Sequence, residues 1–412
     1  MNAAIISIGN ELLSGQENTN ASWLAQSLTT NGINVNKIYT ISDDKNEIKR
    51  TLDDSFSEAD ILIMTGGLGP TKDDITKSTL CQYFGCGIRI SESAYRNIEK
   101  IFNDRGLPVT LANKKQAEVP DIAKTIPNLQ GTAPGLWFDN GIKTLVAMPG
   151  VPFEMKMMFE NFIIPQLNVK YNLPRIISRT ILTLGIGESF LSDLIAPWEK
   201  SIPAGIKLAY LPSPGLVKLR LTGSDEENFQ MENIIENLIT NLQQIIPEYI
   251  FGYDNQKLEC IVGSLLVNKN ATLSIAESCT GGFLSHLITS CPGSSEYYKG
   301  SVISYANEAK ADLLKIDKSI IETKGAVSDE VVRAMAVNAR KLFKTDYSIA
   351  TTGVAGPGGG STAKPVGTVW IGVATPVNVT ARMYLLGENR DVNINRASVN
   401  ALNMLRKELL KS

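Results

Sequence analysis

Residues 274–282, with the sequence SIAESCTGG, could carry a nucleophile. The apolar run of residues 271–276 predicts a buried strand, and a helical pattern begins near Gly281. Ser278 would therefore lie on a strand-to-helix turn, among the free N–H groups of a first helical turn. Such a turn suits a hydroxyl nucleophile with donors for an oxyanion, and it equally suits phosphate binding. A plain helix cap is the third interpretation, and the motif alone leaves all three open.

A hydroxyl nucleophile in this chain needs a base other than histidine. The only histidine, His286, lies within the apolar pattern of residues 283–288, which favours a partly buried structural side chain. Tyr305 and Lys310 belong to the segment YANEAK at a second strand-to-helix junction, and a desolvated lysine can activate a serine. The sequence therefore offers a Ser278–Lys310–Tyr305 arrangement, with a solvated helix lysine as the alternative role of Lys310.

Two further segments near the C-terminus could hold a substrate. The glycine-rich loop of residues 353–360 suits a phosphate or a planar ring, and a mobile surface loop is the alternative. Arg390 and Arg396 begin the closing helical pattern and could clamp a phosphate, although arginines on a helix surface are common.

Glycines and carboxylates also gather where strands end in the first part of the chain. The segments are GNELLSG (residues 9–15), TGGLGPTKDDIT (residues 65–76) and MPGVPFE (residues 148–154). The glycines allow a phosphate to approach the backbone, and Thr71 could cap the helix that follows. Asp73 and Asp74 are hard oxygen ligands for a divalent metal, unless they only complement the dipole of that helix.

These segments belong to a chain of alternating strands and helices. Residues 3–9, 33–41, 60–64 and 144–148 have strand patterns and residues 21–31 and 46–57 have helix patterns, which together predict a doubly wound, mainly parallel α/β domain. Such sheets bind ligands at the carboxyl ends of their strands. A small α+β module follows, then a second α/β domain from the helix at residues 258–268. The expected domains are residues 1–170, 171–254 and 255–412.

Bulk composition narrows the class of protein. A chain of 412 residues with 43% hydrophobic and 20% charged residues fits two or three globular domains. A net charge of −2 without a basic cluster argues against nucleic acid as the main partner. Five cysteines without C-x-x-C spacing argue against a disulfide framework or a zinc site and for a reduced cytoplasm. No segment has the pattern of a signal peptide or a membrane span, so no membrane partner is expected.

The motifs together resemble the CinA family over nearly the whole chain. TGGLGPTKDD, GNELLSG and MPGVPFEM are similar to the MoaB/MogA-type molybdopterin-binding fold, and more closely to the N-terminal domain of CinA proteins. AESCTGG, YANEAK, TGVAGP and the arginine-rich helix start resemble the C-terminal CinA domain of the PncC type. The resemblance implies two α/β domains joined by a small KH-like α+β module. The segment GIGE at residues 185–188 departs from the KH signature in spacing and charge, which favours a spacer or dimerisation role over RNA binding.

For the C-terminal domain, the resemblance implies deamidation of nicotinamide mononucleotide to nicotinate mononucleotide and ammonia, without a cofactor. Ser278 would be the nucleophile, Lys310 the base and Tyr305 a relay, and only the family pattern ranks Ser278 above Cys279. The residues expected to bind this substrate are Cys279, Thr280, Gly281, Gly282, Thr352, Gly353, Ala355, Gly356, Arg390 and Arg396.

For the N-terminal domain, the resemblance implies metal-dependent cleavage of ADP-ribose to AMP and ribose 5-phosphate. Glu11, Asp73 and Asp74 would serve a divalent ion (Mg, Mn or Co) or the attacking water. The residues expected to bind the substrate are Asn10, Asn18, Asn20, Gly66, Gly67, Gly69, Pro70, Thr71, Pro149 and Gly150. Two alternatives stay open, a regulatory protein that binds nucleotides or a pterin without turnover and a molybdopterin-handling enzyme. A homodimer is expected.

Overall fold

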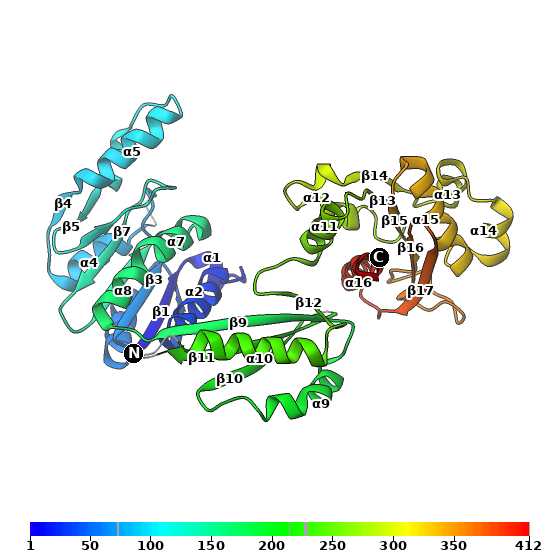
Figure 1. Ribbon diagram of the computed structural model, residues 1–412. Coiled ribbons are helices and arrows are strands. Elements are labelled where there is room, and N and C mark those ends of the chain that lie inside the picture. The colour runs from blue at the N-terminus through cyan, green and yellow to red at the C-terminus, as the bar shows by residue number, and fades with distance from the viewer. Residues whose placement is uncertain (72–73, 214, 226–229, 412) are drawn as a thin grey trace. The chain divides into compact units, whose positions relative to one another are not determined.

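The computed structural model describes residues 1–71, 74–213, 215–225 and 230–411 and divides into two compact units (Figure 1). Unit 1 comprises Met1–Ile177 and Gly223–Met231, and unit 2 comprises Ser178–Thr222 and Glu232–Ser412. Unit 2 thus joins most of the middle module to the last α/β domain.

Unit 1 is organised around a six-stranded sheet with the order β2-β1-β3-β8-β7-β6. The strands are β1 (Asn2–Ile8), β2 (Asn34–Ile41), β3 (Ile61–Thr65), β6 (Lys124–Ile126), β7 (Gly135–Asp139) and β8 (Thr144–Met148). The first four strands of this order are parallel, whereas β7 and β6 each run antiparallel to the preceding neighbour. The predicted, mainly parallel sheet is therefore confirmed, and the carboxyl ends of β1, β3 and β8 meet at one edge.

Alternate residues of β1 enter two different cores, because successive side chains of a strand point to opposite faces. Ala3 and Ile5 pack with α2, α7, η1 and α8, whereas Ala4 and Ile6 pack with α3 and α4. A two-stranded sheet of β4 and β5 accompanies α5 and α6. The bounds are α1 (Asn10–Leu13), α2 (Thr19–Thr30), α3 (Lys45–Glu58), α4 (Thr76–Phe84), β4 (Ile88–Ile90), α5 (Glu92–Asp104), α6 (Leu111–Gln116), β5 (Glu118–Pro120), α7 (Pro152–Met158), the π-helical η1 (Phe159–Ile163) and α8 (Ile164–Tyr171).

The middle module is a four-stranded sheet with the order β10-β11-β9-β12. Its elements are β9 (Arg175–Leu184), α9 (Glu188–Glu199), β10 (Ile206–Ser213), β11 (Leu216–Asp225), α10 (Met231–Ile245) and β12 (Ile250–Tyr253). The residues of segment 247–253 predict an ordered linker, but this segment contains β12, which pairs antiparallel with β9 and completes the sheet edge. The helical pattern of residues 226–246 predicts a long helix, which the structure describes from Met231 onward; residues 226–229 lie outside the described chain.

The last domain has a five-stranded sheet with the order β14-β13-β15-β16-β17. Its elements are α11 (Leu258–Asn268), β13 (Leu273–Glu277), α12 (Phe283–Thr289), the 3-10 turn η2 (Ser294–Glu296), β14 (Tyr298–Ile303), α13 (Asn307–Leu314), α14 (Lys318–Lys324), α15 (Asp329–Phe343), β15 (Tyr347–Gly353), β16 (Thr368–Ala374), β17 (Val379–Leu385) and α16 (Arg390–Lys411). β13 is parallel to both β14 and β15, whereas β16 and β17 are antiparallel.

Both faces of β13 are buried, which explains its continuous apolar run. Leu273 and Ile275 pack with α11, α12 and α16, and Ala276 packs on the opposite face with α13, α14 and α15. Because β13 lies between its two parallel partners β14 and β15, its carboxyl end places Ser278 beside the carboxyl ends of both strands.

Two expectations about individual side chains are wrong. Cys260 and Cys291 form a disulfide, because α11 packs against the α12 segment and brings cysteines 31 positions apart together. His286 is exposed rather than partly buried, since the buried residues of α12 are Leu284 and Ile288.

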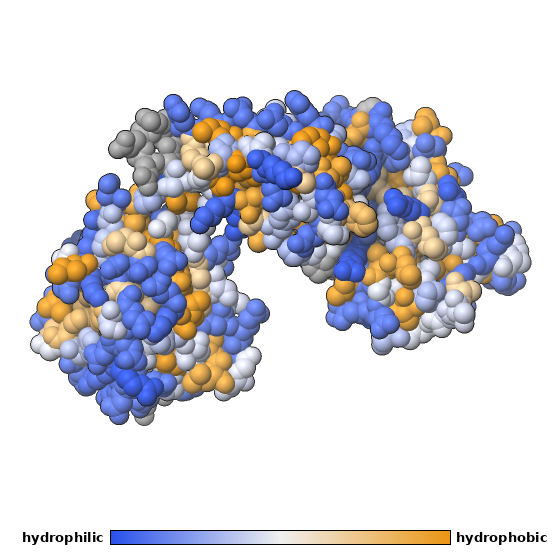
Figure 2. All heavy atoms as spheres, turned by 90° about the horizontal axis from the view of Figure 1, so that it is seen from below, coloured by the Kyte–Doolittle hydropathy of each residue, from blue (hydrophilic) through white to orange (hydrophobic). Residues whose placement is uncertain are grey.

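None of the helices in the described residues is long and apolar enough to cross a bilayer. On the face that Figure 2 shows, hydrophobic residues lie in separate groups between hydrophilic ones.

Candidate active sites

Ser278 and Lys310 face each other at the carboxyl ends of β13 and β14. Ser278 follows β13 and is 7% exposed, and Lys310 lies in the first turn of α13 and is 1% exposed. Lys310 Nζ lies 3.0 Å from Ser278 Oγ, within hydrogen-bonding distance. The parallel pairing of β13 with β14 accounts for this approach, because both strand-to-helix turns then lie at the same sheet edge.

The surroundings of Lys310 lower the pKa of its amine. Nζ donates to the carbonyl oxygens of Ser304 (2.8 Å) and Tyr305 (3.2 Å). Burial lowers the pKa of Lys310 below its ordinary value, because a cation is poorly solvated there. A neutral amine that donates to both carbonyls keeps its lone pair for the Ser278 proton, which is the geometry of a general base.

Cys279 is a weaker candidate for the nucleophile. Burial raises the pKa of its thiol to about 12, so the thiol stays protonated near neutral pH. The amine of Lys310 hydrogen-bonds to Ser278 instead. These two observations favour Ser278, a choice that the residues of the motif left open.

The turn after Ser278 leaves two backbone donors for an oxyanion. Gly281 N donates to Ser278 O (3.2 Å), and Gly282 N donates to a carboxylate oxygen of Glu277 (2.9 Å). Within the described part of the chain, the N–H groups of Cys279 and Thr280 donate to no other residue. Gly281, which was expected to bind the substrate, therefore has its N–H group occupied within the turn.

A cavity of about 220 Å³ opens beside Ser278. Eight predicted residues line it, namely Ser278, Cys279, Tyr305, Lys310, Thr352, Gly353, Ala355 and Arg390. Five predicted residues are not in its lining, namely Thr280, Gly281, Gly282, Gly356 and Arg396. Three residues were not predicted: Asn307, which belongs to the quoted segment YANEAK, and Ala326 and Val327, which no motif indicated.

The residues outside the lining support the site from behind. Thr280 is buried and its hydroxyl lies 2.7 Å from that of Thr351, while Gly281 and Gly282 have φ of +58° and +102° and turn the chain into α12. Gly356 accepts a hydrogen bond from Arg390 through its carbonyl oxygen.

Tyr305 and the two arginines depart from their predicted arrangement. The hydroxyl of Tyr305 accepts from Arg390 (3.0 Å), and only its backbone carbonyl contacts Lys310. The contacts therefore do not include the predicted proton relay through the phenol of Tyr305. Tyr305 is 59% exposed, and its hydroxyl contacts Arg390 rather than Lys310. Arg396 donates to Leu386 O (2.7 Å), so Arg390 is the arginine available to a ligand in the cavity.

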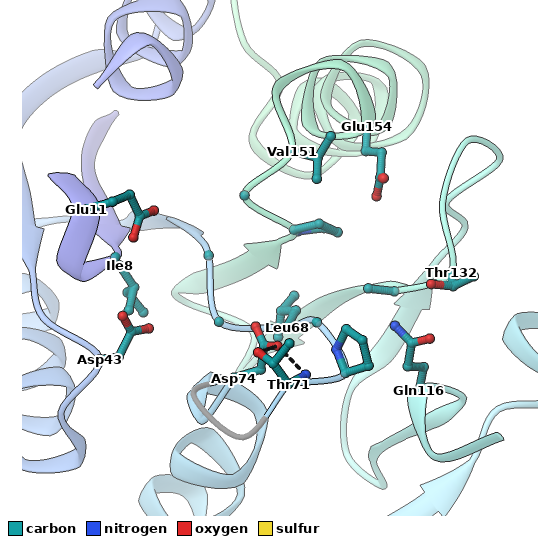
Figure 3. Close-up of a pocket in the computed structure, with 18 residues that line it drawn as sticks. Ile8, Glu11, Asp43, Leu68, Thr71, Asp74, Gln116, Thr132, Val151 and Glu154 are labelled. Atoms are coloured by element: carbon teal, nitrogen blue, oxygen red, sulfur yellow. Dashed lines mark hydrogen bonds between the residues drawn. The ribbon is translucent and has the colours of Figure 1, made fainter. Parts of the chain in front are cut away.

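A second cavity, of about 420 Å³, lies at the carboxyl ends of β1, β3 and β8 in unit 1 (Figure 3). Nine predicted residues line it, namely Glu11, Gly66, Gly67, Gly69, Pro70, Thr71, Asp74, Pro149 and Gly150. Polar lining residues that were not predicted are Asp43, Gln116, Thr132 and Glu154. Glu154 lies within the motif MPGVPFEM and could have been noticed, whereas Asp43 follows β2 without a motif.

The packing of the strand ends requires the glycines of the loop after β3. A Cβ on Gly66, whose φ is +102°, would lie 2.1 Å from the carbonyl oxygen of Ile8. A Cβ on Gly67 would lie 2.1 Å from the hydroxyl of Thr76. Close approach of the chain to itself, as well as to any phosphate, therefore demands glycine here.

Thr71 donates to Asp74 instead of capping the following helix. Thr71 does not cap α4, which begins at Thr76. Instead its N–H (2.7 Å) and its hydroxyl (2.5 Å) both donate to Asp74 Oδ2, which closes the turn (Figure 3). Asp74 thus stabilises the loop backbone with one of its oxygens.

The three predicted asparagines lie outside the cavity lining. Asn18 caps α2 by accepting from Ala21 N (3.0 Å), and Asn20 donates to Gly150 O (2.7 Å). The backbone N–H of Asn10 donates to Asp43 (3.2 Å). They fix the loops rather than contact a ligand, because the chain uses them as local hydrogen-bonding groups.

The two predicted metal-binding residues that the structure describes, Glu11 and Asp74, are not grouped with a third such ligand. Glu11, Asp43, Asp74 and Glu154 come from four different segments around the cavity, as Figure 3 shows. Throughout the described residues, no three His, Cys, Asp or Glu side chains are grouped so that they could hold a metal ion. Asp73, the remaining predicted ligand, lies outside the described residues.

Comparison with known proteins assigns both cavities to matched domains. The models that match are "Probable molybdopterin binding domain" over residues 4–169, "Damage-inducible protein CinA KH domain" over residues 178–252, and "CinA C-terminal domain" over residues 255–409. A CinA-like protein of Flavobacterium psychrophilum is 45% identical, and the alignment covers 100% of this chain and 99% of the relative. The chain belongs to the CinA family. A putative competence-damage inducible protein of Caldicellulosiruptor saccharolyticus is 40% identical, with 100% of both chains covered.

The CinA match confirms the fold class and the family expected from the motifs. Among solved structures, the competence/damage inducible protein CihA of Agrobacterium tumefaciens is 33% identical over 36% of this chain and 92% of its own, with a TM-score of 0.36. Ser278 and Lys310 lie in the CinA C-terminal match, and the cavity of unit 1 lies in the molybdopterin-binding match.

Proposed function

We propose that the C-terminal domain hydrolyses the carboxamide of nicotinamide mononucleotide, giving nicotinate mononucleotide and ammonia. The observation that carries this proposal is the hydrogen bond between the buried amine of Lys310 and the hydroxyl of Ser278. A serine paired with a desolvated lysine can perform acyl transfer without histidine, and the one histidine of this chain is exposed and outside the cavity lining.

Acylation begins with proton transfer from Ser278 to Lys310. As the Oγ–carbon bond forms, the carbonyl electron pair moves to oxygen, and the N–H group of Cys279, which lines the cavity, is the donor available to hold that oxyanion. When the carbonyl re-forms, the carbon–nitrogen bond breaks and Lys310 returns its proton to the leaving nitrogen. Ammonia departs, and the substrate's acyl group remains as an ester of Ser278.

Deacylation repeats the same proton transfers with water. Lys310 accepts a proton from the attacking water, the carbon–Oγ bond breaks, and Ser278 regains its proton from Lys310. The cation at Arg390 is the group that would hold the substrate phosphate, since it lines the cavity and is oriented by Gly356 and Tyr305.

The test compares Ser278→Ala with Ser290→Ala, an exposed serine just after α12. Ammonia release from nicotinamide mononucleotide by the full chain should fall at least about 1,000-fold in Ser278→Ala and stay unchanged in Ser290→Ala. Cys279→Ala should lose far less activity than Ser278→Ala. Wild-type activity in Ser278→Ala contradicts the proposal, and tight binding without product favours a regulatory protein.

We further propose that the cavity of unit 1 binds ADP-ribose and cleaves it to AMP and ribose 5-phosphate. Two observations support this proposal: the cavity volume of about 420 Å³ and the glycine-lined strand ends, which suit a pyrophosphate. The described lining carries four carboxylates and neither lysine nor arginine, so a pyrophosphate bound there requires a neutralising cation.

The corresponding experiment measures AMP formation with and without chelator. Asp74→Ala and Glu154→Gln should abolish it, whereas Asp54→Ala on the exposed face of α3 should not. Retained turnover in both cavity variants refutes the assignment. Preference for a pterin phosphate over ADP-ribose in a competition assay supports the molybdopterin alternative.

A further inference from the structure

Glu277, the residue before the proposed nucleophile, has a fully buried carboxylate. Four donors of the following segment surround it. Its two oxygens accept from Gly282 N (2.9 Å), Leu284 N (3.1 Å), Ser285 N (2.9 Å) and Ser285 Oγ (2.5 Å). An ionised carboxylate is an acceptor at every lone pair, so it matches this set of donors, whereas a carboxamide would turn its own NH₂ toward them.

These contacts close the turn that carries Ser278. The chain leaves β13 at Glu277, passes through Ser278 and the turn of residues 279–281, and returns to the Glu277 side chain at Gly282. Both ends of the turn are therefore fixed to one residue. The carboxylate takes the N–H groups of residues 282, 284 and 285, whereas that of Cys279, which lines the cavity, is left for a substrate oxyanion.

The backbone of Glu277 also connects to the lysine. Ser304 N donates to Glu277 O (2.8 Å), and the carbonyl oxygen of Ser304 accepts from Lys310 Nζ (2.8 Å). Glu277 therefore holds the serine turn with its side chain and the lysine-binding carbonyl with its backbone. It is not in the lining of the cavity, so it acts through its neighbours.

We propose that Glu277 is a positioning residue, which sets the geometry between Ser278 and Lys310 from beneath the turn. This inference rests on the amide hydrolysis proposed above. Glu277→Gln keeps the shape of the side chain but places an NH₂ group against backbone donors, so the turn shifts. A displacement of about 1 Å costs roughly 100-fold in the chemical step.

The experiment uses the full chain with Glu277→Gln, Ser285→Ala and, as control, Thr289→Ala at the end of α12. It measures kcat and KM for nicotinamide mononucleotide per mole of folded protein, and the rate at which a fluorophosphonate phosphonylates Ser278. Glu277→Gln should lower kcat and the phosphonylation rate roughly 100-fold with KM changed by less than about twofold. Ser285→Ala, which removes one donor, should lower both rates by roughly threefold to tenfold, and Thr289→Ala neither.

The outcomes separate this inference from the proposed function. A folded Glu277→Gln chain with wild-type rates overturns the inference, and if that variant does not fold, wild-type rates in Ser285→Ala overturn it. A merely structural role reduces the amount of folded protein without changing the rates per folded molecule. If the wild-type chain is phosphonylated at Ser278 but releases no ammonia, the proposed substrate is wrong, while the phosphonylation ratios still decide the role of Glu277.

Discussion

Lys310 places an amine in an almost fully buried position, with two carbonyl oxygens and one hydroxyl around its Nζ. A buried lysine costs folding free energy, because the charged form that the unfolded chain prefers is poorly solvated inside. We therefore expect Lys310 to contribute to catalysis and to lower the free energy of unfolding.

Lys310→Met should therefore separate activity from stability. We expect amide hydrolysis to fall at least about 1,000-fold, because the base is lost. The free energy of unfolding should rise by on the order of 1 kcal/mol, because an apolar chain of similar length fills the site. Urea denaturation and ammonia release measure the two effects, with the exposed Lys318→Met as control. A simultaneous loss of stability and activity would contradict this account.

The lowered pKa of Lys310 also predicts a pH dependence. The neutral amine is the base, so kcat/KM should rise with pH through a pKa below the ordinary value of 10.5. Between that lowered pKa and 10.5 the unfolded chain binds more protons than the folded one, so the free energy of unfolding should also rise with pH. Lys310→Met should remove this component of the stability profile, and an unchanged profile would show that the lysine is not perturbed.

Arg390 gives a prediction about substrate choice. Arg390→Ala should lower kcat/KM for nicotinamide mononucleotide roughly 10- to 100-fold, because a charge-assisted contact to the phosphate is lost. The riboside, which lacks the phosphate, should be hydrolysed equally well by both proteins. Arg396→Ala serves as the control, since Arg396 donates to Leu386 O outside the cavity lining. Equal losses for both substrates would remove Arg390 from phosphate binding.

At the scale of elements, close backbone contacts hold together the loops at the carboxyl ends of β1, β3 and β8. The side chain of Asn20 donates to the carbonyl oxygen of Gly150. Gly66 N donates to Met148 O (3.0 Å), and Gly66 packs against the carbonyl of Ile8. The parallel order β1-β3-β8 makes these loops neighbours, so the loops of the cavity are held by one another.

Gly66→Ala and Gly141→Ala form a matched pair that tests this junction. Both residues have positive φ, +102° and +86°, but a Cβ on Gly141 meets no atom within 4 Å. Gly141→Ala should cost about 1 kcal/mol, the ordinary penalty for a left-handed alanine. Gly66→Ala should cost about 3 kcal/mol or more, because the Ile8 carbonyl must also move. Similar losses of unfolding free energy in the two variants would show that the junction adapts.

Elements with strong periodicity were predicted with nearly the observed bounds. α11 and β8 match the expected ranges of residues 258–268 and 144–148. The short edge strand β12 was assigned to a linker, because four residues carry too little periodicity and its partner β9 is distant in sequence.

At the scale of the whole molecule, the described chain divides into two compact units. Leu182, Leu184 and Phe251 of the middle module share a core with α11 and α16, and Arg406 donates to the carbonyl oxygens of Glu248 and Ile250. Two thermal transitions are therefore expected.

The disulfide should affect only one of those transitions. Cys260 and Cys291 close a loop with a sequence separation of 31 within unit 2. Replacing both by serine should destabilise unit 2 by about 2 to 4 kcal/mol and leave the transition of unit 1 unchanged. Calorimetry checks this, with Cys81→Ser of unit 1 as control, and reductant should reproduce the effect in the wild-type chain alone. A shift of both transitions would show that the units unfold together.

The sequence by itself determined the family, the doubly wound class and the motifs that carry Ser278, Lys310 and the glycine-rich strand ends. These properties depend on local residue types and on periodicity, which are visible along the chain. Only the tertiary structure decided that Ser278 and Lys310 meet at 3.0 Å, that Arg390 rather than Arg396 lines the cavity, and that Tyr305 contacts the lysine through its carbonyl. It also decided that Glu277 is buried beneath the turn and that Cys260 bonds to Cys291. Those facts depend on how neighbouring strands pair and on which way each side chain points, and residue spacing does not encode either.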